Sequence, residues 1–334
     1  MRATVVGSGF GTSHLAWLNA CQDVRITVLG YRHDRRRAQL AAARYNIPRI
    51  TSDPKELLEF SDTDLVVIAS PPGTHEAIAL AAMERGLAVM CEKPLAATLD
   101  QSVRMADAAR RHGIRAAVTF QWREHAAFKD LRAELGDDRF GELLFADLSF
   151  HHDFLAAGTT EWPWRHSRAT AGAGALADLG VHLFDLLCWL TGSGWSVRSA
   201  QAQVAWPERR AAGGMIACET DDVAFVELSS GASAAAARIL VSRVSPGHRE
   251  LRVTAVGTRS VVGVVADPAD GSARVLRSGA AACGESVIPP QDMNPYPGLI
   301  ADIQQGTVTG PGFPDGVTAQ SLVSQSLAAA DARA

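Results

Sequence analysis

The sequence predicts an α/β protein in two parts. We expect a first domain with a parallel sheet covered by helices on both faces, and a second, α+β domain with a large, mostly antiparallel sheet. Over the first 120 residues, short β-branched runs alternate with longer alanine-rich amphipathic runs; after about residue 122, short alternating segments punctuated by glycine and proline replace them. The length of 334 residues suits two domains, which we place at residues 1–122 and 123–334.

The strands expected in the first domain are nearly continuous in apolar residues, as strands buried on both faces are. They are residues 3–6, 25–29, 65–69, 87–91 and 115–119. Helical periodicity lies between them, at 13–20, 35–45, 54–60, 74–85 and 99–111. This alternation is typical of a parallel sheet.

The second domain is expected to begin with a helix at 124–135 and a strand at 142–151. A loop rich in tryptophan and glycine then leads to a helix at 175–190. From the end of this helix to about residue 290, short alternating segments predict further strands, among them 223–228, 234–241, 250–256 and 260–265. A Pro- and Gly-rich loop at 294–316 and a terminal helix at 317–332 are expected to follow.

Composition argues against several classes of protein. A net charge of −4 gives no positive field to attract nucleic acid or an anionic membrane surface, and no apolar run approaches the roughly 20 residues that span a bilayer. The five cysteines are scattered without C-x-x-C spacing, which is typical of a reducing cytoplasm, and the N-terminus does not resemble a signal peptide. We therefore expect a cytoplasmic protein with no nucleic-acid or membrane partner. No metal site is expected either, because the histidines and acids of the second domain lack compact ligand spacing; these are His151, His152, Asp153, His166 and His182.

A glycine-rich turn follows the first strand and opens the first helix. It reads Gly7-Ser8-Gly9-Phe10-Gly11-Thr12. Gly7 would permit the tight turn, Gly9 would let the backbone approach a pyrophosphate, and the helix N-terminus would bind it. Thr12 stands where the strict G-x-G-x-x-G/A pattern has a small residue. The alternative is an ordinary glycine turn, but its position after a first strand favours a Rossmann-type dinucleotide site.

The end of the second expected strand bears on the choice of cofactor. An NAD site commonly has an acid there for the ribose 2′-hydroxyl. Here the strand runs into Tyr31 and Arg32, and the first acid is Asp34. An arginine can bind a 2′-phosphate bidentately and stack on adenine, so we expect NADP(H) to be preferred, with NAD(H) as the alternative. The arginines at 35–37 have the simpler interpretation of a solvated helix start.

Lys93 lies at the carboxyl end of the strand at 87–91, before Pro94. Ligands of open parallel sheets bind beyond this edge. A lysine before a proline is usually a surface residue, but Lys93 is one of only three lysines in the chain, with Lys55 and Lys129. Its position makes it a candidate for catalysis.

Four motifs in order make the sequence resemble the Gfo/Idh/MocA family of oxidoreductases (glucose–fructose oxidoreductase, inositol dehydrogenase and relatives). They are the turn at 7–12 followed by His14; Ser70-Pro71-Pro72-x-x-His75; Glu92-Lys93-Pro94; and Gly174-Ala175-Leu176-x-Asp178-x-Gly180-x-His182-x-x-Asp185. The resemblance covers most of the chain. It implies that Lys93, Asp178 and His182 form the catalytic group, and that Trp164 and Arg165 lie near nicotinamide and substrate. The cofactor contacts that it implies include Ser70, Pro71, Pro72, His75, Glu92 and Gln121.

On a helical wheel, Asp178, His182 and Asp185 share one face of the helix at 175–190 with Trp189, and leucines occupy the opposite face. Such a helix would aim its polar face at a cleft. The alternative is a set of satisfied, partly buried polar residues.

The resemblance implies hydride transfer at a secondary carbinol or carbonyl carbon of a sugar, nucleotide sugar or cyclitol. His182 is suited to act as acid/base, while Lys93 could either stabilise the reacting oxygen or donate its proton. Asp178 would orient the imidazole or bind a substrate hydroxyl. Further candidate pocket residues are Gln121, Arg123, His151 and residues 162–165.

NADPH preference would suggest a reductase. Imine or open-chain carbonyl reduction remains an alternative, as does a non-catalytic NADP-sensing regulator that uses the same fold. By analogy with the fold, we expect a homodimer or homotetramer.

Overall fold

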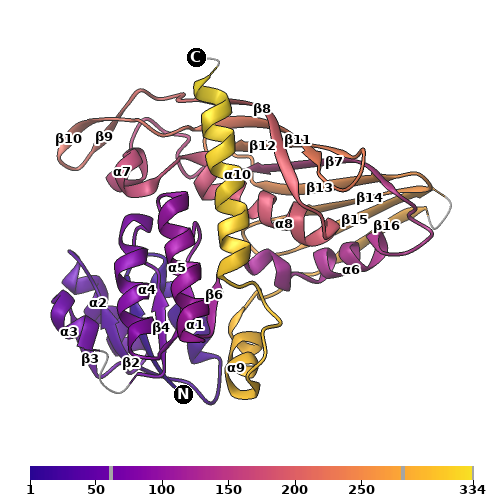
Figure 1. Ribbon diagram of the computed structural model, residues 1–334. Helices are drawn as coiled ribbons and strands as arrows, with labels where there is room; N and C mark the ends of the chain where they lie inside the picture. Colours follow the sequence, from indigo (N-terminus) through magenta and orange to yellow (C-terminus); the bar gives the residue numbers. More distant parts are fainter. Residues whose placement is uncertain (60–62, 280–282, 333–334) are drawn as a thin grey trace. The chain divides into compact units, whose positions relative to one another are not determined.

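The structure is a computed structural model that describes residues 1–59, 63–279 and 283–332. The chain forms two compact units (Figure 1). Unit 1 comprises Met1–Thr119 and Asn294–Val317, and unit 2 comprises Phe120–Met293 and Thr318–Ala334. This division departs from the expected one chiefly because 294–317 returns to unit 1, where Tyr296, Leu299 and Phe313 are buried in the core.

Unit 1 contains a six-stranded parallel sheet in the order β3-β2-β1-β4-β5-β6. Its strands are β1 (Arg2–Val6), β2 (Arg25–Gly30), β3 (Arg49–Thr51), β4 (Leu65–Ile68), β5 (Ala88–Cys91) and β6 (Ala116–Val118). Its helices are α1 (Gly11–Asn19), α2 (Arg35–Arg44), α3 (Pro54–Glu59), α4 (His75–Glu84), α5 (Leu99–His112) and α9 (Tyr296–Gln305). This confirms the predicted Rossmann-type fold. The three-residue strand β3 was missed because so short a run shows no periodicity.

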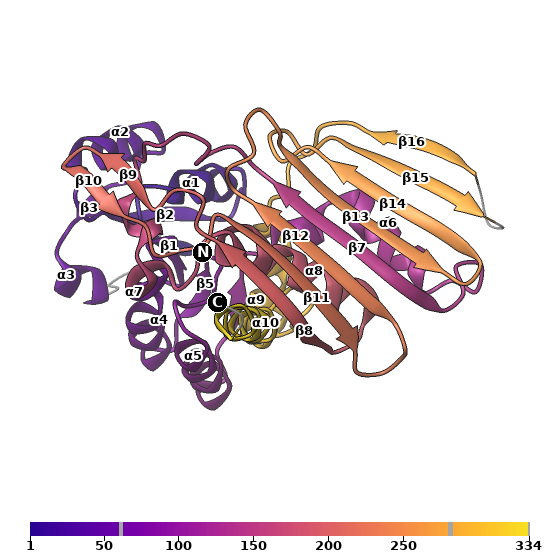
Figure 2. The same ribbon diagram turned by 90° about the horizontal axis from the view of Figure 1, so that it is seen from above.

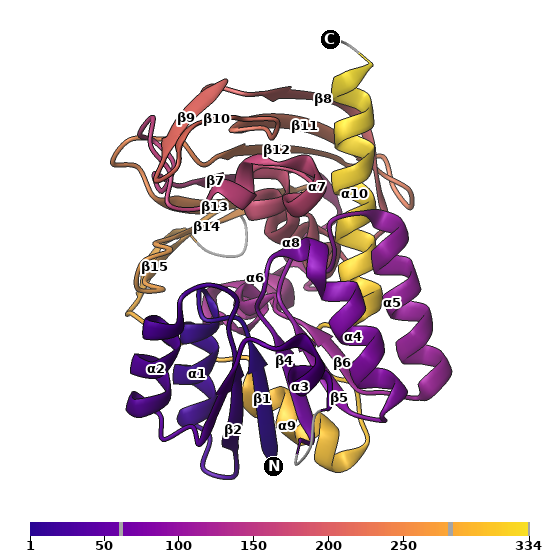
Figure 3. The same cartoon turned by 90° about the vertical axis from the view of Figure 1, so that its left-hand side faces the viewer.

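Alternating side chains of the sheet build two separate cores. In β1, Ala3 and Val5 pack on one face with residues of α1, α2 and α9, whereas Val6 packs on the other with residues of α4 and α5. Figure 3 shows α1 and α2 on one side of the strands and α4 and α5 on the other. Because both faces are covered, β4 is buried at every position from Leu65 to Ile68.

Unit 2 is built on an eight-stranded sheet in the order β16-β15-β14-β13-β7-β12-β11-β8 (Figure 2). Its strands are β7 (Leu143–His151), β8 (Trp195–Gln203), β11 (Val223–Ser230), β12 (Ala236–Ser242), β13 (Glu250–Gly257), β14 (Ser260–Ala266), β15 (Ala273–Gly279) and β16 (Gly284–Ile288). Among these, β7 and β12 form a parallel pair and the other neighbours are antiparallel, which confirms a mostly antiparallel sheet. A separate hairpin consists of β9 (Glu208–Ala211) and β10 (Gly214–Ala217).

One face of this sheet supports the core of unit 2. Ala146, Leu148 and Phe150 of β7 are buried on this face. The helices of the unit are α6 (Ala126–Leu135), α7 (Arg168–Ala171), α8 (Val181–Thr191) and most of α10 (Phe313–Asp331), and α6 and α8 pack against the sheet. The opposite face carries Phe225, which is 48% exposed, and Leu276, which is 37% exposed.

Three predictions for local structure need correction. The stretch 294–316 is not merely a loop, because it contains α9, and α10 begins at Phe313 rather than at 317. Strands β8, β9, β10, β15 and β16 lie within the stretch expected to form short strands, but their individual bounds were not predicted. Residue 60, at the end of the expected helix 54–60, lies outside the described residues.

The segment Arg168–Thr191 is long and apolar enough to cross a membrane by length and composition alone, which the sequence analysis did not anticipate. Its most apolar window has a mean hydropathy of 1.4 and is 83% buried inside the structure, as in the core helix of a globular protein.

Candidate functional site

The residues predicted to bind the cofactor in unit 1 follow the carboxyl ends of four parallel strands. Residues 7–12 follow β1, Tyr31 and Arg32 follow β2, residues 70–75 follow β4, and Glu92 and Lys93 follow β5. Because carboxyl ends of parallel strands share one edge of a sheet, the structure brings these four segments to a common edge.

Two glycines of the phosphate-binding turn have different roles. Gly7 adopts φ +122°, and a Cβ there would lie 2.3 Å from the carbonyl oxygen of Ala69, so no other residue fits without displacing the backbone. A Cβ at Gly9 would meet no atom of the described residues within 4 Å. The backbone at Gly9 is therefore open to the approach of a pyrophosphate, and the N-terminus of α1 follows directly, as a dinucleotide requires.

Thr12, the departure from the strict glycine pattern, is accommodated within the turn. Its hydroxyl donates a hydrogen bond of 2.9 Å to the carbonyl oxygen of Gly9. Gly11 is the residue that faces the sheet, since a Cβ there would lie 3.6 Å from Val5 Cγ1 and 3.7 Å from Ala69 Cβ. The place where helix and strand meet is thus kept small by Gly11 rather than by residue 12.

The segment after β2 presents arginines. Arg32 is exposed just beyond the strand end. The first acid after the strand, Asp34, accepts a 2.8 Å hydrogen bond from the backbone N–H of Arg37 and so serves as the N-cap of α2. Arg37 is more than part of a solvated helix start, because its Nη2 lies 3.5 Å from the carbonyl oxygen of Gly9.

The turn after β5 is buried and hydrogen-bonded. Glu92 is 6% exposed, and its Oε2 accepts the backbone N–H of Lys93 at 3.1 Å. Burial raises the pKa of the Glu92 carboxyl, but a hydrogen bond from His14 and the nearby Lys93 charge outweigh it, so this pKa lies below its ordinary value. The imidazole of His75 joins β4 to this turn, with Nε2 2.7 Å from Ser70 O and Nδ1 3.2 Å from Leu95 O.

In unit 2, Asp178 is held by two arginines. Its Oδ1 accepts from Arg165 Nη1, and its Oδ2 accepts from Arg243 Nη1 at 3.1 Å. The guanidinium of Arg165 also stacks on the ring of Trp164, 4.5 Å from its centroid. The structure therefore brings the predicted residues Asp178, Trp164 and Arg165 together.

Sequence reasoning missed the buried charges behind Asp178. Arg243 and Arg209 have fully buried side chains, and both donate to Asp222 Oδ1, at 3.0 and 3.2 Å. No local pattern marks these residues, because an arginine in an alternating β segment is ordinarily a solvent-facing one. Asp221, which precedes Asp222, shows in the sequence only as one of two adjacent acids, and nothing in the sequence marks it as buried.

The helix at 175–190 starts with a π-helical turn, Leu176–Gly180, which continues into α8. Asp221 caps it from outside, accepting the backbone N–H groups of Gly174 at 2.7 Å and Leu176 at 2.8 Å. Burial raises the pKa of Asp221 above its ordinary value in spite of these bonds. Gly174 must be glycine, because a Cβ there would lie 1.8 Å from the carbonyl oxygen of Asp221.

The polar face predicted for this helix is buried and paired. Asp185 forms a two-pronged ion pair with Arg123, with Nε–Oδ2 2.9 Å and Nη2–Oδ1 2.5 Å. His182 is 4% exposed and lies between the rings of Phe120 and Phe150, at centroid distances of 6.2 and 6.3 Å. For Asp185 the structure therefore matches the alternative of a satisfied buried group, and it gives the candidate pocket residue Arg123 a protein partner.

The remaining predicted residues of unit 2 lie on separate elements. His151, at the end of β7, has its Nδ1 3.1 Å from Ser245 Oγ and its ring 4.7 Å from that of His248. Gln121 lies in a short 3₁₀ turn, Gln121–Glu124, and its buried Oε1 finds no hydrogen-bond partner among the described residues. Lys93 belongs to unit 1, whereas Asp178 and His182 belong to unit 2.

Because His166 lies near the buried arginines Arg243 and Arg209, it makes the stability of the protein depend on pH. His166 is 1% exposed. Its burial and the positive charges of Arg243 and Arg209 lower its pKa to about 4. The unfolded chain takes up this proton near pH 6.5, so between about pH 6.5 and 4 unfolding binds a proton and stability falls as pH falls, by up to roughly 1.4 kcal/mol per pH unit.

We therefore expect His166→Gln to flatten the acid side of the stability curve. The measurement is urea unfolding of wild type and variant between pH 4 and 8. His75, His125, His151 and His152 also have lowered pKa values and act in the same direction, so the difference between the two curves isolates His166. Parallel curves would contradict the prediction.

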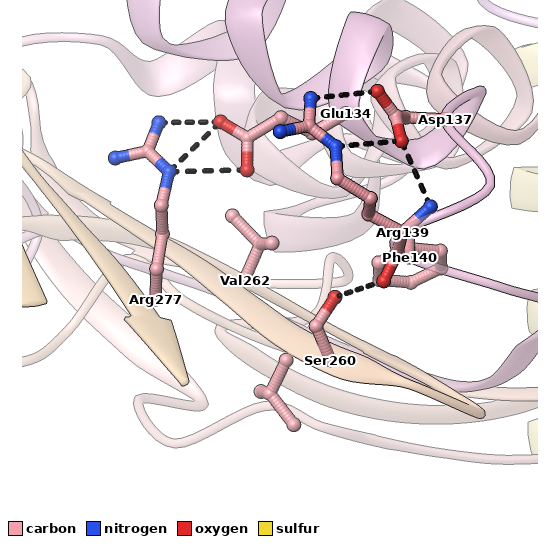
Figure 4. Close-up of a pocket in the computed structure, with 8 residues that line it drawn as sticks. Glu134, Asp137, Arg139, Phe140, Ser260, Val262 and Arg277 are labelled. Carbon is pink, nitrogen blue, oxygen red and sulfur yellow. Dashed lines mark hydrogen bonds and ion pairs between the residues drawn. The ribbon is translucent and has the colours of Figure 1, made fainter. Parts of the chain in front are cut away.

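A cavity of about 190 Å³ in unit 2 lies apart from the predicted residues (Figure 4). Its charged groups are satisfied by one another: Arg277 pairs with Glu134, and Arg139 with Asp137. Within the described ranges, no group of three or more His, Cys, Asp or Glu side chains is placed to hold a metal ion.

Solved structures of other proteins share this fold over the whole chain, and two of them serve as examples. A levoglucosan dehydrogenase in complex with NADH and levoglucosan superimposes with a TM-score of 0.88 at 22% identity, covering 100% of this chain and 98% of that one. An NAD binding oxidoreductase from Klebsiella pneumoniae gives 0.86 at 25% identity, covering 100% and 98%.

Curated relatives match over shorter stretches. A levoglucosan dehydrogenase of Pseudarthrobacter phenanthrenivorans is 32% identical over 169 residues, 51% of this chain and 43% of its own length. An inositol 2-dehydrogenase of Acidothermus cellulolyticus is 34% identical over 192 residues, 57% of this chain and 53% of its own. The matched part thus spans about half the length of these relatives.

Family models match both halves of the chain. Residues 1–120 match the model described as the oxidoreductase family with an NAD-binding Rossmann fold, and residues 128–262 match the model of the Gfo/Idh/MocA C-terminal domain. With both models matched in order along one chain, and the fold that they describe present in each unit, this protein belongs to the Gfo/Idh/MocA family of oxidoreductases.

Proposed function

We propose that the protein is an NAD(P)(H)-dependent oxidoreductase that moves a hydride at a secondary carbinol or carbonyl carbon of a sugar, nucleotide sugar or cyclitol. One observation carries the proposal: the phosphate-binding turn, the arginine segment after β2 and Lys93 follow strands that end at one edge of the parallel sheet of unit 1. The relatives named levoglucosan dehydrogenase and inositol 2-dehydrogenase support the substrate class.

The bound nicotinamide would supply or accept the hydride. The chain must then move a proton at the substrate oxygen, and Lys93 Nζ and the His182 imidazole are the groups that we assign to it. Asp178 binds two arginines, so we assign it the role of fixing Arg165 beside Trp164, where the guanidinium and the indole can contact a polyhydroxylated ring. The buried Oε1 of Gln121 is a further hydrogen-bond acceptor for a ligand.

We also propose a preference for NADPH over NADH. The support is local charge: Arg32 is exposed at the end of β2, Arg37 reaches toward the phosphate-binding turn, and the first carboxylate after β2 in the sequence, Asp34, serves as a helix cap. NADH in the complexes of a related fold favours the alternative cofactor. Preference for NADPH would fit a physiological reductase.

Fluorescence titration with NADPH and NADH tests this preference. We expect Arg32→Ala to weaken NADPH binding by about 10- to 100-fold, the value of one charge-assisted phosphate contact, with little change for NADH. Arg36→Ala, which removes an exposed arginine of α2 four residues further along the chain, is the matched control. Equal or tighter binding of NADH by the wild type would refute the NADPH preference, and no binding of either cofactor would refute the enzymatic proposal.

Two alternatives remain tied to specific measurements. Imine or open-chain carbonyl reduction would appear as oxidation of NADPH with those substrates and not with ketosugars. A non-catalytic NADP sensor would bind NADPH and turn over no member of the panel.

We further propose a cytoplasmic homodimer or homotetramer. The face of the eight-stranded sheet opposite the core carries apolar side chains, including Phe225 and its register partner Leu240, and a second copy would cover them. The molar mass in solution decides between monomer and oligomer.

A further inference from the structure

A chain of three buried titratable groups runs from the C-terminal segment of unit 1 to the Glu92-Lys93 turn. Tyr296 Oη lies 2.5 Å from His14 Nδ1, and His14 Nε2 lies 2.9 Å from Glu92 Oε1. The residues Tyr296 and His14 have no exposed surface, and Glu92 is 6% exposed. The second carboxylate oxygen of Glu92 accepts the backbone N–H of Lys93.

The chemistry of the groups gives these hydrogen bonds a direction. An ionised Glu92 can only accept, so His14 Nε2 carries a hydrogen. In a neutral imidazole Nδ1 is then an acceptor, and the Tyr296 hydroxyl donates to it. Burial raises the pKa of the Tyr296 phenol well above its ordinary value, which keeps it a donor. Tyr296 thus holds the tautomer of His14 that donates to Glu92.

The same residues tie three distant parts of unit 1 together. His14 lies on α1, Glu92 follows β5, and Tyr296 is the first residue of α9. Asn294 fastens the returning segment, since its Nδ2 donates to Trp17 O at 3.0 Å and its Oδ1 accepts Tyr296 N–H at 3.0 Å.

We propose that Tyr296 is a positioning residue for proton chemistry at Lys93 and acts through His14 and Glu92. This rests on the role assigned above to Lys93. Without the hydroxyl, His14 Nδ1 loses its buried hydrogen-bond donor, so the imidazole is no longer fixed from its far side. The hydrogen bond from Nε2 to Glu92 then weakens, and the counter-charge beside the Lys93 ammonium is held less firmly. Other titratable groups whose charge bears on Glu92 or Tyr296 are His75, Cys91 and Cys21.

The test measures the pKa of Lys93, and it is practical because the chain has only three lysines. Reductive methylation with ¹³C-formaldehyde labels Lys55, Lys93 and Lys129, and the Lys93 signal is assigned by Lys93→Arg. We expect Tyr296→Phe to lower the Lys93 pKa by about half a unit or more, while the other two lysines do not shift. Tyr45→Phe, which removes a hydroxyl from a ring packed on the same core, is the matched control.

Activity supplies a second readout. We expect kcat of Tyr296→Phe to fall about tenfold with the KM for cofactor within about twofold of wild type. In a Glu92→Gln background the same change should cause no further shift of Lys93, because the carboxylate through which it acts is gone. If Tyr296→Phe does not fold, Glu92→Gln still tests the proposal, because loss of the carboxylate should lower the Lys93 pKa directly.

An unchanged Lys93 titration in folded Tyr296→Phe, or in Glu92→Gln, overturns the proposal. The titration requires no substrate. If the wild type reduces no sugar, cyclitol precursor, imine or ketone, the proposed function is contradicted. The role of Tyr296 through His14 and Glu92 is then still decided by the Lys93 titration.

Discussion

Replacing Lys93 by methionine is expected to lower kcat at least 10³-fold while changing the dissociation constant for NADPH by less than about threefold. Methionine has an unbranched side chain only one atom shorter than that of lysine, but it can neither donate a proton nor stabilise a negative oxygen, and such groups contribute about 10²–10⁴-fold each. Steady-state kinetics together with a fluorescence titration of each variant measure the two effects. Lys129→Met, at an exposed lysine paired with Glu124, is the matched control.

A Lys93→Arg variant separates the two roles that Lys93 can have. Arginine keeps the charge but does not release its proton. Partial recovery of kcat relative to Lys93→Met would indicate electrostatic stabilisation of the substrate oxygen, and no recovery would indicate proton donation. Full turnover by Lys93→Met would remove Lys93 from the mechanism and leave His182 as the acid/base.

Replacing Arg243 by methionine is expected to destabilise the protein by about 3–5 kcal/mol, because Asp178 and Asp222 each lose a charge-assisted hydrogen bond in a buried setting and keep only one arginine each. For a protein of this size the loss corresponds to a decrease in Tm on the order of 10 °C. Calorimetry or urea unfolding at pH 7 provides the measurement.

The control for Arg243 is an arginine of the same sheet with an exposed ion pair. Arg238 bonds Asp147 at 2.7 Å but its side chain is 59% exposed, so Arg238→Met should cost less than about 1 kcal/mol. If both variants lose the same small amount of stability, the buried network does not hold unit 2 together. A large loss of stability in Arg243→Met, with little loss in Arg238→Met, supports the role of the buried network in stabilising unit 2.

Local sequence patterns determined the architecture of unit 1 and the positions of its ligand-facing turns. Near-continuous apolar runs alternate with helical periodicity because strands buried on both faces and amphipathic helices each repeat at a fixed spacing. Lys93 could be singled out because a strand end in a parallel sheet is itself a place where ligands bind. The family motifs then identified Asp178 and His182, which no spacing argument could have separated from ordinary buried polar residues.

Only the tertiary structure decided which charged and polar groups meet. Tyr296 and His14 are 282 residues apart, Arg243 and Asp178 are 65 apart, and Arg123 and Asp185 are 62 apart. An arginine looks the same in the sequence whether it faces water or, like Arg243, lies fully buried between two carboxylates. The segment 294–317 looks like a loop in the sequence, because its helix α9 is short and interrupted by Pro and Gly. It becomes part of unit 1 only through long-range packing of Tyr296, Leu299 and Phe313. Periodicity reports which face of an element is buried, but not its distant partner, and in this protein the partners determine the charge around the candidate site.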